Sequence, residues 1–294
     1  MIYIWTISFS YKRNNIYPPH TIPMITNSLD TILQTPEKKL ITIRHFHSTA
    51  QEFASKVWEM QQAGKCKDEY SIKQLKNEYS KNIWHDLYAT LSVRWVSWFK
   101  EKHGIYKDLV WKILKKPLII QTSPYVRCIE SLALLLSDYN ENIGKTLLKT
   151  RKELLEFEIN NVPVTIRIND MLIERSLWNT FPDVFPPQIE NNESNLTQSQ
   201  KEKLWYYEKV NWWESMVNVM MRCKLMLQEL YESPENQLRI SHQLFIWQLI
   251  NTINKWSYYW YAEQDNKNIE NWSISIFQVQ EDKLVPTKII AEGI

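Results

Sequence analysis

Short β-branched runs alternate with helical segments along most of the chain, and this alternation limits the folds available to it. The strand-like runs lie at residues 39–44, 118–122, 162–168 and 237–240. The segments with helical spacing of apolar residues lie at 49–62, 125–137, 201–231 and 243–255. Such alternation is typical of a mainly parallel sheet with helices on both faces. The sequence therefore predicts an α/β three-layer sandwich.

The remaining segments define the expected domain organisation. Residues 1–37 read as an extended, proline-containing N-terminal extension, and 38–294 as a single domain. Within that domain we expect two insertions, a polar and mostly helical one near 138–161 and a Pro- and Asn-rich lid near 179–200. The alternating runs 272–278 and 283–290 predict a closing hairpin. A chain of 294 residues, 44% hydrophobic, is long enough for one large core.

Charge, hydropathy and cysteine usage exclude several classes of function. The 35 basic and 33 acidic residues are spread along the chain, so neither nucleic acid nor an anionic membrane is implied. No apolar run approaches the roughly 20 residues that span a bilayer. Cys66, Cys128 and Cys223 are far apart and lack metal-ligand spacing, which indicates reduced thiols in an intracellular compartment. We expect the cytoplasm, while the nearly acid-free segment 1–36 leaves the mitochondrion open.

Polar and charged side chains follow four of the expected strands. They are Arg44 and His45, Ser123 and Arg127, Glu174, and Ser241 and His242. The carboxyl ends of parallel strands meet at one rim of a sheet, so we expect these groups to converge there. Together they supply a nucleophile, donors for anionic oxygens and a carboxyl for proton transfer, which is the equipment that phosphoryl transfer needs.

Several motifs occur in an order that matches one known family. The matching stretches are RHFHS (44–48), DLYATLS (86–92), TSPYVRCIES (122–131), LIER (172–175), Glu214-Ser215 with Arg222, RISH (239–242) and NWSISIF (271–277). On these residues the chain resembles the histidine phosphatase superfamily, whose fold is phosphoglycerate-mutase-like. The resemblance covers nearly all of the chain beyond the N-terminal extension.

The resemblance implies a role for each matched residue. His45 would attack phosphorus and become phosphohistidine, and Glu174 would protonate the leaving oxygen and later activate water. The phosphoryl oxygens would be held by Arg44, Arg127 and His242, with Ser48 as a further hydroxyl donor. No metal or cofactor is required. The expected substrate is a phosphorylated small molecule or a phosphoprotein, and the expected reaction is hydrolysis of its monoester.

The chain departs from the family pattern where the family uses glycine. Phe46 and Gln243 follow the two histidines, while Trp95 and Trp178 replace two further glycines. Gln51 stands where the family has an asparagine near the phosphate. Glycine allows positive φ or a close approach of backbone to ligand, so these changes predict a narrower, remodelled or closed pocket. The chain has four glycines in all.

Several alternatives stay open at the level of sequence. The lost glycines also fit a catalytically degenerate protein that serves as a structural or binding subunit of a larger complex, and mutase activity is a third reading. Glu156 and Glu158 compete with Glu174 for the acid role. The 14 tryptophans, with aromatic clusters at 95–98, 212–213 and 256–261, suggest core filler or a surface for a partner or a second copy.

Overall fold

The fold is described by a computed structural model of the chain. It describes residues 38–63, 88–102, 112, 117–137, 142–150, 154–159, 161–174, 214–253, 273–280 and 283–290. The expected N-terminal extension at 1–37 and the expected lid at 179–200 lie outside the described residues.

A mixed seven-stranded sheet forms the middle layer, in the order β3-β4-β2-β5-β1-β6-β7. The strands are β1 (Lys39–Arg44), β2 (Leu118–Thr122), β3 (Leu154–Ile159), β4 (Val162–Ile168), β5 (Asn236–Ser241), β6 (Ile274–Gln280) and β7 (Lys283–Ile290). The central strands β4, β2, β5 and β1 are parallel to one another, and β3, β6 and β7 are antiparallel to their neighbours. The parallel strands bring their carboxyl ends to one rim.

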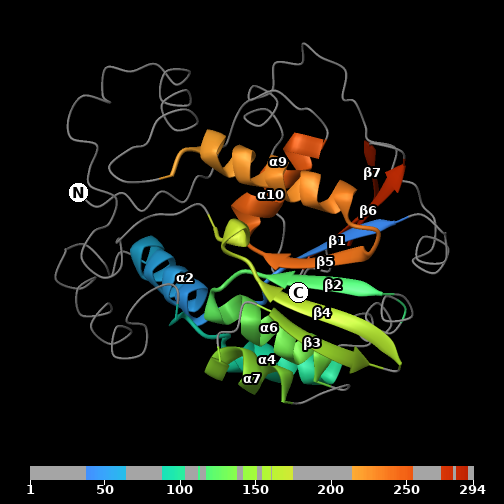
Figure 1. The fold of residues 1–294 in the computed structure, drawn as a ribbon. Helices are drawn as coiled ribbons and strands as arrows, with labels where there is room; N and C mark the ends of the chain where they lie inside the picture. Colours follow the sequence, from blue (N-terminus) through green and yellow to red (C-terminus); the bar gives the residue numbers. More distant parts are fainter. Residues whose placement is uncertain are drawn as a thin grey trace, which may run out of the picture.

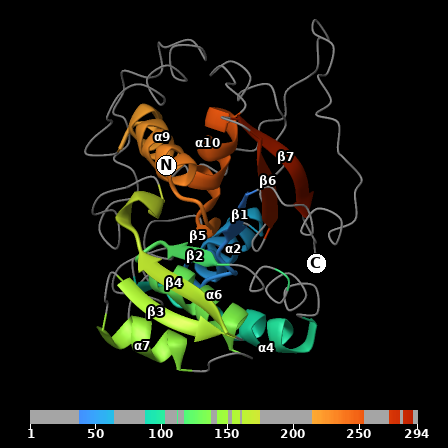
Figure 2. The same ribbon diagram turned by 45° about the vertical axis from the view of Figure 1, so that its right-hand side comes forward.

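Helices cover both faces of this sheet (Figure 1). On one side lie α2 (Thr49–Gln62), α4 (Val93–Lys102), α6 (Val126–Leu136) and α7 (Ile143–Thr150). On the other lie α9 (Met216–Glu232) and α10 (Gln243–Ile253). The turned view in Figure 2 keeps α9 and α10 on the opposite side from α4, α6 and α7. The expected α/β three-layer sandwich is confirmed. In the described part of the chain, no helix combines the length and apolar character needed to cross a membrane.

The two faces of the sheet differ in polarity because successive side chains of a strand point to opposite sides. Towards α6 the sheet is apolar, and Ile43, Ile120 and Ile240 belong to one buried hydrophobic cluster there. Towards α9 and α10, a second apolar cluster shares the face with a row of buried polar residues. In the strand register, Gln121 lies opposite Arg239, and Arg239 lies opposite Thr42 on the neighbouring strand. This polar row runs beneath α9 and α10.

The segment 138–161 differs from its expected mostly helical character. Helix α7 occupies part of it, but 154–159 forms the edge strand β3, paired antiparallel with β4. Leu155 and Phe157 are half-buried whereas Glu156 and Glu158 are exposed, which is the period-two pattern of a strand with one face towards the core. The helical expectation was wrong there because this short alternation was not recognised. The expected hairpin near the C-terminus is present as β6 and β7.

Candidate active site

Backbone hydrogen bonds carry the strand pairing one residue beyond the central strands and so align the residues at the rim. The amide of His45 donates to the carbonyl of Ser241 at 2.9 Å, and the amide of Ser123 donates to that of Ile240 at 3.1 Å. These bonds hold the residues that follow β1, β2 and β5 at one level. The imidazoles of His45 and His242 consequently lie close together, with ring centroids 5.0 Å apart and an edge-on arrangement.

Arg127, on the first turn of α6, contacts both imidazoles. Its Nε donates to Nε2 of His45 at 3.2 Å, and its Nη2 lies 3.4 Å from Nδ1 of His242. The same guanidinium lies over the ring of Tyr125, 4.6 Å from the centroid. All three charged or titratable groups are nearly enclosed, with exposed fractions of 4% for His45, 5% for Arg127 and 0% for His242.

These contacts fix the tautomer of each imidazole, because a guanidinium can only donate hydrogen bonds. At His45, Nε2 must accept from Arg127, so Nδ1 carries the proton and donates to the carbonyl of Phe46 at 2.7 Å. At His242, Nδ1 accepts, and Nε2 carries the proton towards Oγ of Ser123 at 2.9 Å. Each ring therefore turns an unprotonated nitrogen towards the guanidinium.

Both histidines are held in the neutral form. Burial lowers the pKa of His45 well below its usual value, and the charges of Arg127 and Arg44 lower that pKa further. The pKa of His242 is likewise lowered, first by burial and then by Arg127, His45 and Arg44. A neutral imidazole with a free ring nitrogen is a nucleophile, whereas the imidazolium is not.

Arg44 and Glu174 are the other two charged residues expected at this rim. The positive charge of Arg44 lowers the pKa of both His45 and His242. Glu174 follows the 3-10 helix η2 (Asp170–Leu172), and its Oε2 lies 3.4 Å from the amide of Leu244, two residues beyond His242. The structure thus brings the Glu174 carboxylate to the start of α10, within two residues of His242 along the chain.

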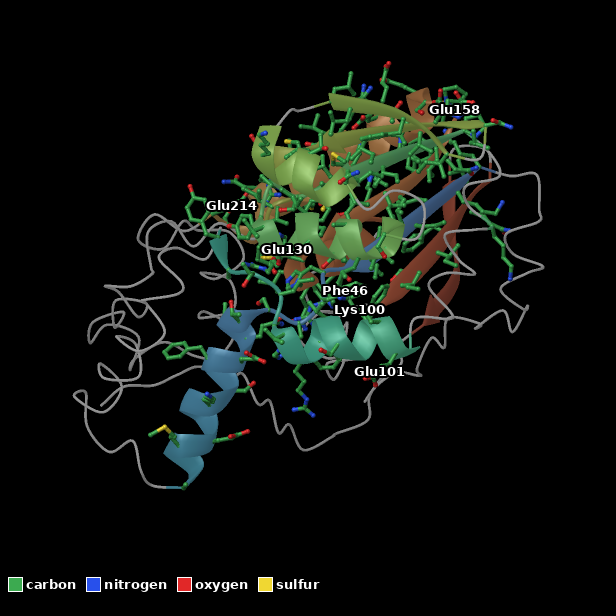
Figure 3. The ribbon with its side chains drawn as sticks, turned by 90° about the horizontal axis from the view of Figure 1, so that it is seen from below. Phe46, Lys100, Glu101, Glu130, Glu158 and Glu214 are labelled. Carbon is green, nitrogen blue, oxygen red and sulfur yellow. The ribbon has the colours of Figure 1, made fainter. Side chains whose placement is uncertain are left out.

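The competing carboxylates lie elsewhere. Glu158 pairs with Pro163 at the start of β4, whereas the rim is at its other end, near Ile168. Figure 3 shows Glu158 at one end of the sheet and Glu214, which lies near the Glu174 segment, towards the other. Geometry therefore favours Glu174 over Glu156 and Glu158 as the acidic group of this site.

Ser48 is engaged at the start of α2. Its amide and its hydroxyl both donate to Oε1 of Gln51, at 3.0 and 3.3 Å, and its carbonyl accepts from the amides of Gln51 and Glu52. This is the geometry of a helix N-cap whose third residue reaches back to it. These contacts are those of a residue at a helix N-cap. They also give Gln51 a structural role, because its side chain is the one that reaches back to the cap.

The residues that replace glycine next to the histidines fit without backbone strain. Among the described residues, Asn161 is the one non-glycine residue with positive φ, so neither Phe46 nor Gln243 needs the conformational freedom of glycine. The ring of Phe46 is buried in the core and packs on Phe99 of α4, with centroids 4.8 Å apart, as Figure 3 shows beside α4. The expected bulk beside His45 is therefore directed into the core. Trp178 lies outside the described residues.

Ser123, which was expected at this rim, and two residues without a predicted role, Tyr125 and Ser131, help to build the site. Ser123 contacts His242, and the ring of Tyr125 packs edge-on against the same imidazole at 4.7 Å. Ser131 accepts from the amide of Phe46 at 2.9 Å and donates to the carbonyl of Arg127, so it joins the end of β1 to α6. Ser123 and Ser131 were visible as motif residues, but their partners are 119 and 85 residues away.

The fold and this cluster define an α/β protein with a candidate anion site at the carboxyl ends of its parallel strands. No protein-family model matches the chain, and no match is found among curated proteins. Among solved structures, the chain is similar to the alpha-ribazole phosphatase from Shigella flexneri, with 15% identity, a TM-score of 0.49, and coverage of 84% of this chain and 94% of that one.

Two further similarities are of the same kind. Mycobacterial glucosyl-3-phosphoglycerate phosphatase has a TM-score of 0.48 and 15% identity, with coverage of 86% of this chain and 97% of that one. Phosphoserine phosphatase from Entamoeba histolytica, in complex with 3-phosphoglyceric acid, has a TM-score of 0.43 and 14% identity, with coverage of 86% and 97%.

Proposed function

We propose that this chain is a phosphomonoester hydrolase that forms a phosphohistidine intermediate on His45. The observation that carries the proposal is the tautomer of His45, whose Nδ1–H is held by the carbonyl of Phe46 while its Nε2 faces Arg127. A nucleophilic nitrogen beside a fork of cationic donors suits attack on a phosphorus whose oxygens need compensating charge. The resemblance of the motifs to histidine phosphatases supports the same reaction.

In the first step, Nε2 of His45 attacks phosphorus and the bond to the ester oxygen breaks. Arg127 has to release Nε2, and a phosphoryl group supplies the reason, since its anionic oxygens are better acceptors for guanidinium donors than a neutral imidazole is. Arg44 contributes a second positive charge. Glu174 gives a proton to the leaving oxygen.

In the second step, water attacks the phosphohistidine, Glu174 takes a proton from that water, and the bond between phosphorus and Nε2 breaks. Phosphate leaves and His45 is again neutral. His242 sits within the same cluster, and the dianion bound there would favour its protonated, donating form. All donors in this scheme are side chains of the chain itself, so the proposal invokes no metal.

The test is a phosphoenzyme assay with an adjacent histidine as control. Wild type, His45→Ala and His47→Ala are incubated with a phosphorus-labelled aryl phosphate and quenched in alkali, which preserves phosphohistidine. We expect label on wild type and His47→Ala and none on His45→Ala, because His47 is half-buried and packs on Trp95. Equal phosphate release by wild type and His45→Ala would refute the proposal.

A second candidate function is a catalytically degenerate subunit of a larger assembly. It is favoured by the near-complete burial of His45, His242 and Arg127 and by the hydrogen bonds that already join them. It predicts no turnover, no binding of vanadate and co-purification with a fixed partner. The aromatic clusters at 212–213 and 256–261, which would supply the partner surface, lie outside the described residues. A partner, a second copy of the chain and the natural substrate all remain proposals.

A further inference from the structure

The segment that carries Glu174 is held by an unusual concentration of side-chain hydrogen bonds. Three consecutive carbonyls of this segment each accept from a side chain. Arg222 Nη1 donates to Met171 at 2.6 Å and to Ile173 at 3.0 Å, and Ser241 Oγ donates to Leu172 at 2.6 Å. The backbone directly before Glu174 is therefore fixed from α9 and from β5.

The start of the same segment is also fixed. Asn169 donates its amide to the carbonyl of Thr122 at 2.9 Å, and its side chain caps η2 by accepting from the amide of Met171 at 2.9 Å. The segment thus leaves the sheet at the end of β4, beside β2, and reaches Glu174 with a hydrogen bond at each successive residue. Few backbone conformations of this stretch satisfy all of these bonds at once.

Arg222 is itself held in place by Glu214. Its Nε and Nη2 donate to the two carboxylate oxygens of Glu214 at 2.8 and 2.7 Å, which is the bidentate geometry of an arginine–carboxylate pair. The two side chains are 12% and 14% exposed, and the guanidinium lies 5.5 Å from the ring centroid of Phe245. One edge of the guanidinium therefore binds Glu214, and its remaining nitrogen binds the carbonyls on either side of Leu172.

We propose that Arg222, oriented by Glu214, is a positioning residue that sets the carboxyl of Glu174 where it exchanges a proton with the leaving oxygen. This inference rests on the proposed function and deepens it. The contacts run from Glu214 to Arg222 and from Arg222 to the carbonyl of Ile173. Glu174 is the residue that follows Ile173. At its other end, the Glu174 carboxylate meets the amide of Leu244 at the start of α10, beside His242.

The role has a chemical signature, because proton donation matters only when the leaving oxygen is basic. In the first step the oxygen–phosphorus bond breaks, the nitrogen–phosphorus bond forms, and an alkoxide leaving group needs a proton from Glu174. A p-nitrophenolate leaves without one. Loss of Arg222 should therefore impair cleavage of an alkyl phosphate while formation of phosphohistidine from p-nitrophenyl phosphate persists.

The experiment compares Arg222→Met with Arg167→Met on both substrates. Arg167 also pairs with a glutamate, Glu229 at 3.1 Å, but it lies near the end of β4 and its guanidinium contacts α9 instead of the carbonyls of residues 171–173. We expect Arg222→Met to lower kcat/KM for the alkyl phosphate by about 10²-fold, the usual size of a general-acid contribution, and to change that for p-nitrophenyl phosphate far less. Arg167→Met should leave both values near wild type. Equal losses on the two substrates, or no loss on either, would overturn the inference.

A double-mutant cycle separates positioning from a general structural effect. In a Glu174→Gln background, Arg222→Met should cost nothing further on the alkyl phosphate, because its effect passes through the missing carboxyl. Full additivity would contradict the inference. Should Arg222→Met not fold, Arg222→Lys and Glu214→Gln take its place, since each loosens the fork while keeping the size of the side chain.

The cycle also separates failure of the inference from failure of the proposed function. If wild type is labelled on His45 but Glu174→Gln loses nothing on the alkyl phosphate, the inference is wrong and the phosphohistidine mechanism stands. If wild type gives neither label nor turnover on either substrate, the proposed function itself is refuted and the inference with it.

Discussion

Two buried neutral histidines should make the fold sensitive to mild acid, and the size of the effect follows from their number. Since the pKa of His45 and that of His242 are both lowered well below the ordinary 6.5, each ring stays neutral in the folded state while it gains a proton in the unfolded chain as pH falls. The unfolded state then binds more protons, so the free energy of unfolding decreases with decreasing pH.

The expected loss begins near the ordinary histidine pKa and grows below it. Each such ring contributes a slope approaching about 1.4 kcal/mol per pH unit, so the pair lowers the free energy of unfolding by about 2.7 kcal/mol between pH 7.5 and 5.5. This stability is fully present above pH about 6.5 and is lost as pH falls towards the lowered pKa values of the folded state. Such a loss is a large part of the stability of a typical domain.

The measurement is urea unfolding at several pH values for wild type and for the double variant His45→Gln/His242→Gln, in buffers without phosphate or sulfate. Groups other than these two titrate in both proteins, so the difference between the two pH profiles isolates the pair. We expect the variant to lose most of the slope below pH about 6.5. The ring of His47 is half-buried and its pKa is lowered less than those of His45 and His242. His47→Gln should therefore change the pH dependence of the free energy of unfolding less than His45→Gln or His242→Gln does.

Parallel profiles for wild type and the double variant would refute the reasoning, because they would mean that the buried rings gain protons in the folded state as readily as in the unfolded one. Repeating the pH profiles with added inorganic phosphate provides a second test. A dianion between Arg127 and the two rings would raise both pKa values in the folded state, so phosphate should flatten the wild-type profile and leave the variant unchanged.

The remaining predictions concern single residues in the core and at the site. Ser48→Ala removes the hydroxyl that donates to Gln51 but keeps the amide that donates to the same oxygen, so it should lower the free energy of unfolding by no more than about 1 kcal/mol. The affinity for inorganic phosphate measured by calorimetry should stay unchanged, and a loss of affinity would show that Ser48 contacts the anion. Phe46→Gly should destabilise the fold by at least about 3 kcal/mol in urea unfolding, because the ring of Phe46 packs on Phe99. A variant as stable as wild type would contradict that packing. Arg239→Met should raise the urea midpoint. This fully buried guanidinium donates to the carbonyl of Met226 and to Gln237 but, within the described part of the chain, forms no ion pair with a carboxylate. A lower midpoint would show that these hydrogen bonds and the charge of Glu229 compensate the burial of Arg239.

The amino-acid sequence alone determined the order of most elements and the rim of the sheet at which the candidate site residues lie. Strands β1, β2, β4 and β5 are short apolar or alternating runs followed by turns and helices, so local pattern predicts them and topology rules then bring their carboxyl ends together. His45, Arg127 and His242 could be assigned to one rim for that reason. The edge strand β3 escaped this reading, because six residues that alternate between apolar and acidic side chains are also compatible with a helix.

Only the tertiary structure decided which contacts each of those residues makes. The tautomer of His45 depends on Arg127, 82 residues away, and the segment before Glu174 depends on Arg222, 51 residues from Met171. The direction of Phe46 into the core and the use of Ser48 as a helix cap likewise follow from which neighbours the fold supplies. A residue's type fixes which hydrogen bonds and charges it can offer, but its pKa, its tautomer and its partner are set by groups that are brought near it only when distant strands and helices pack.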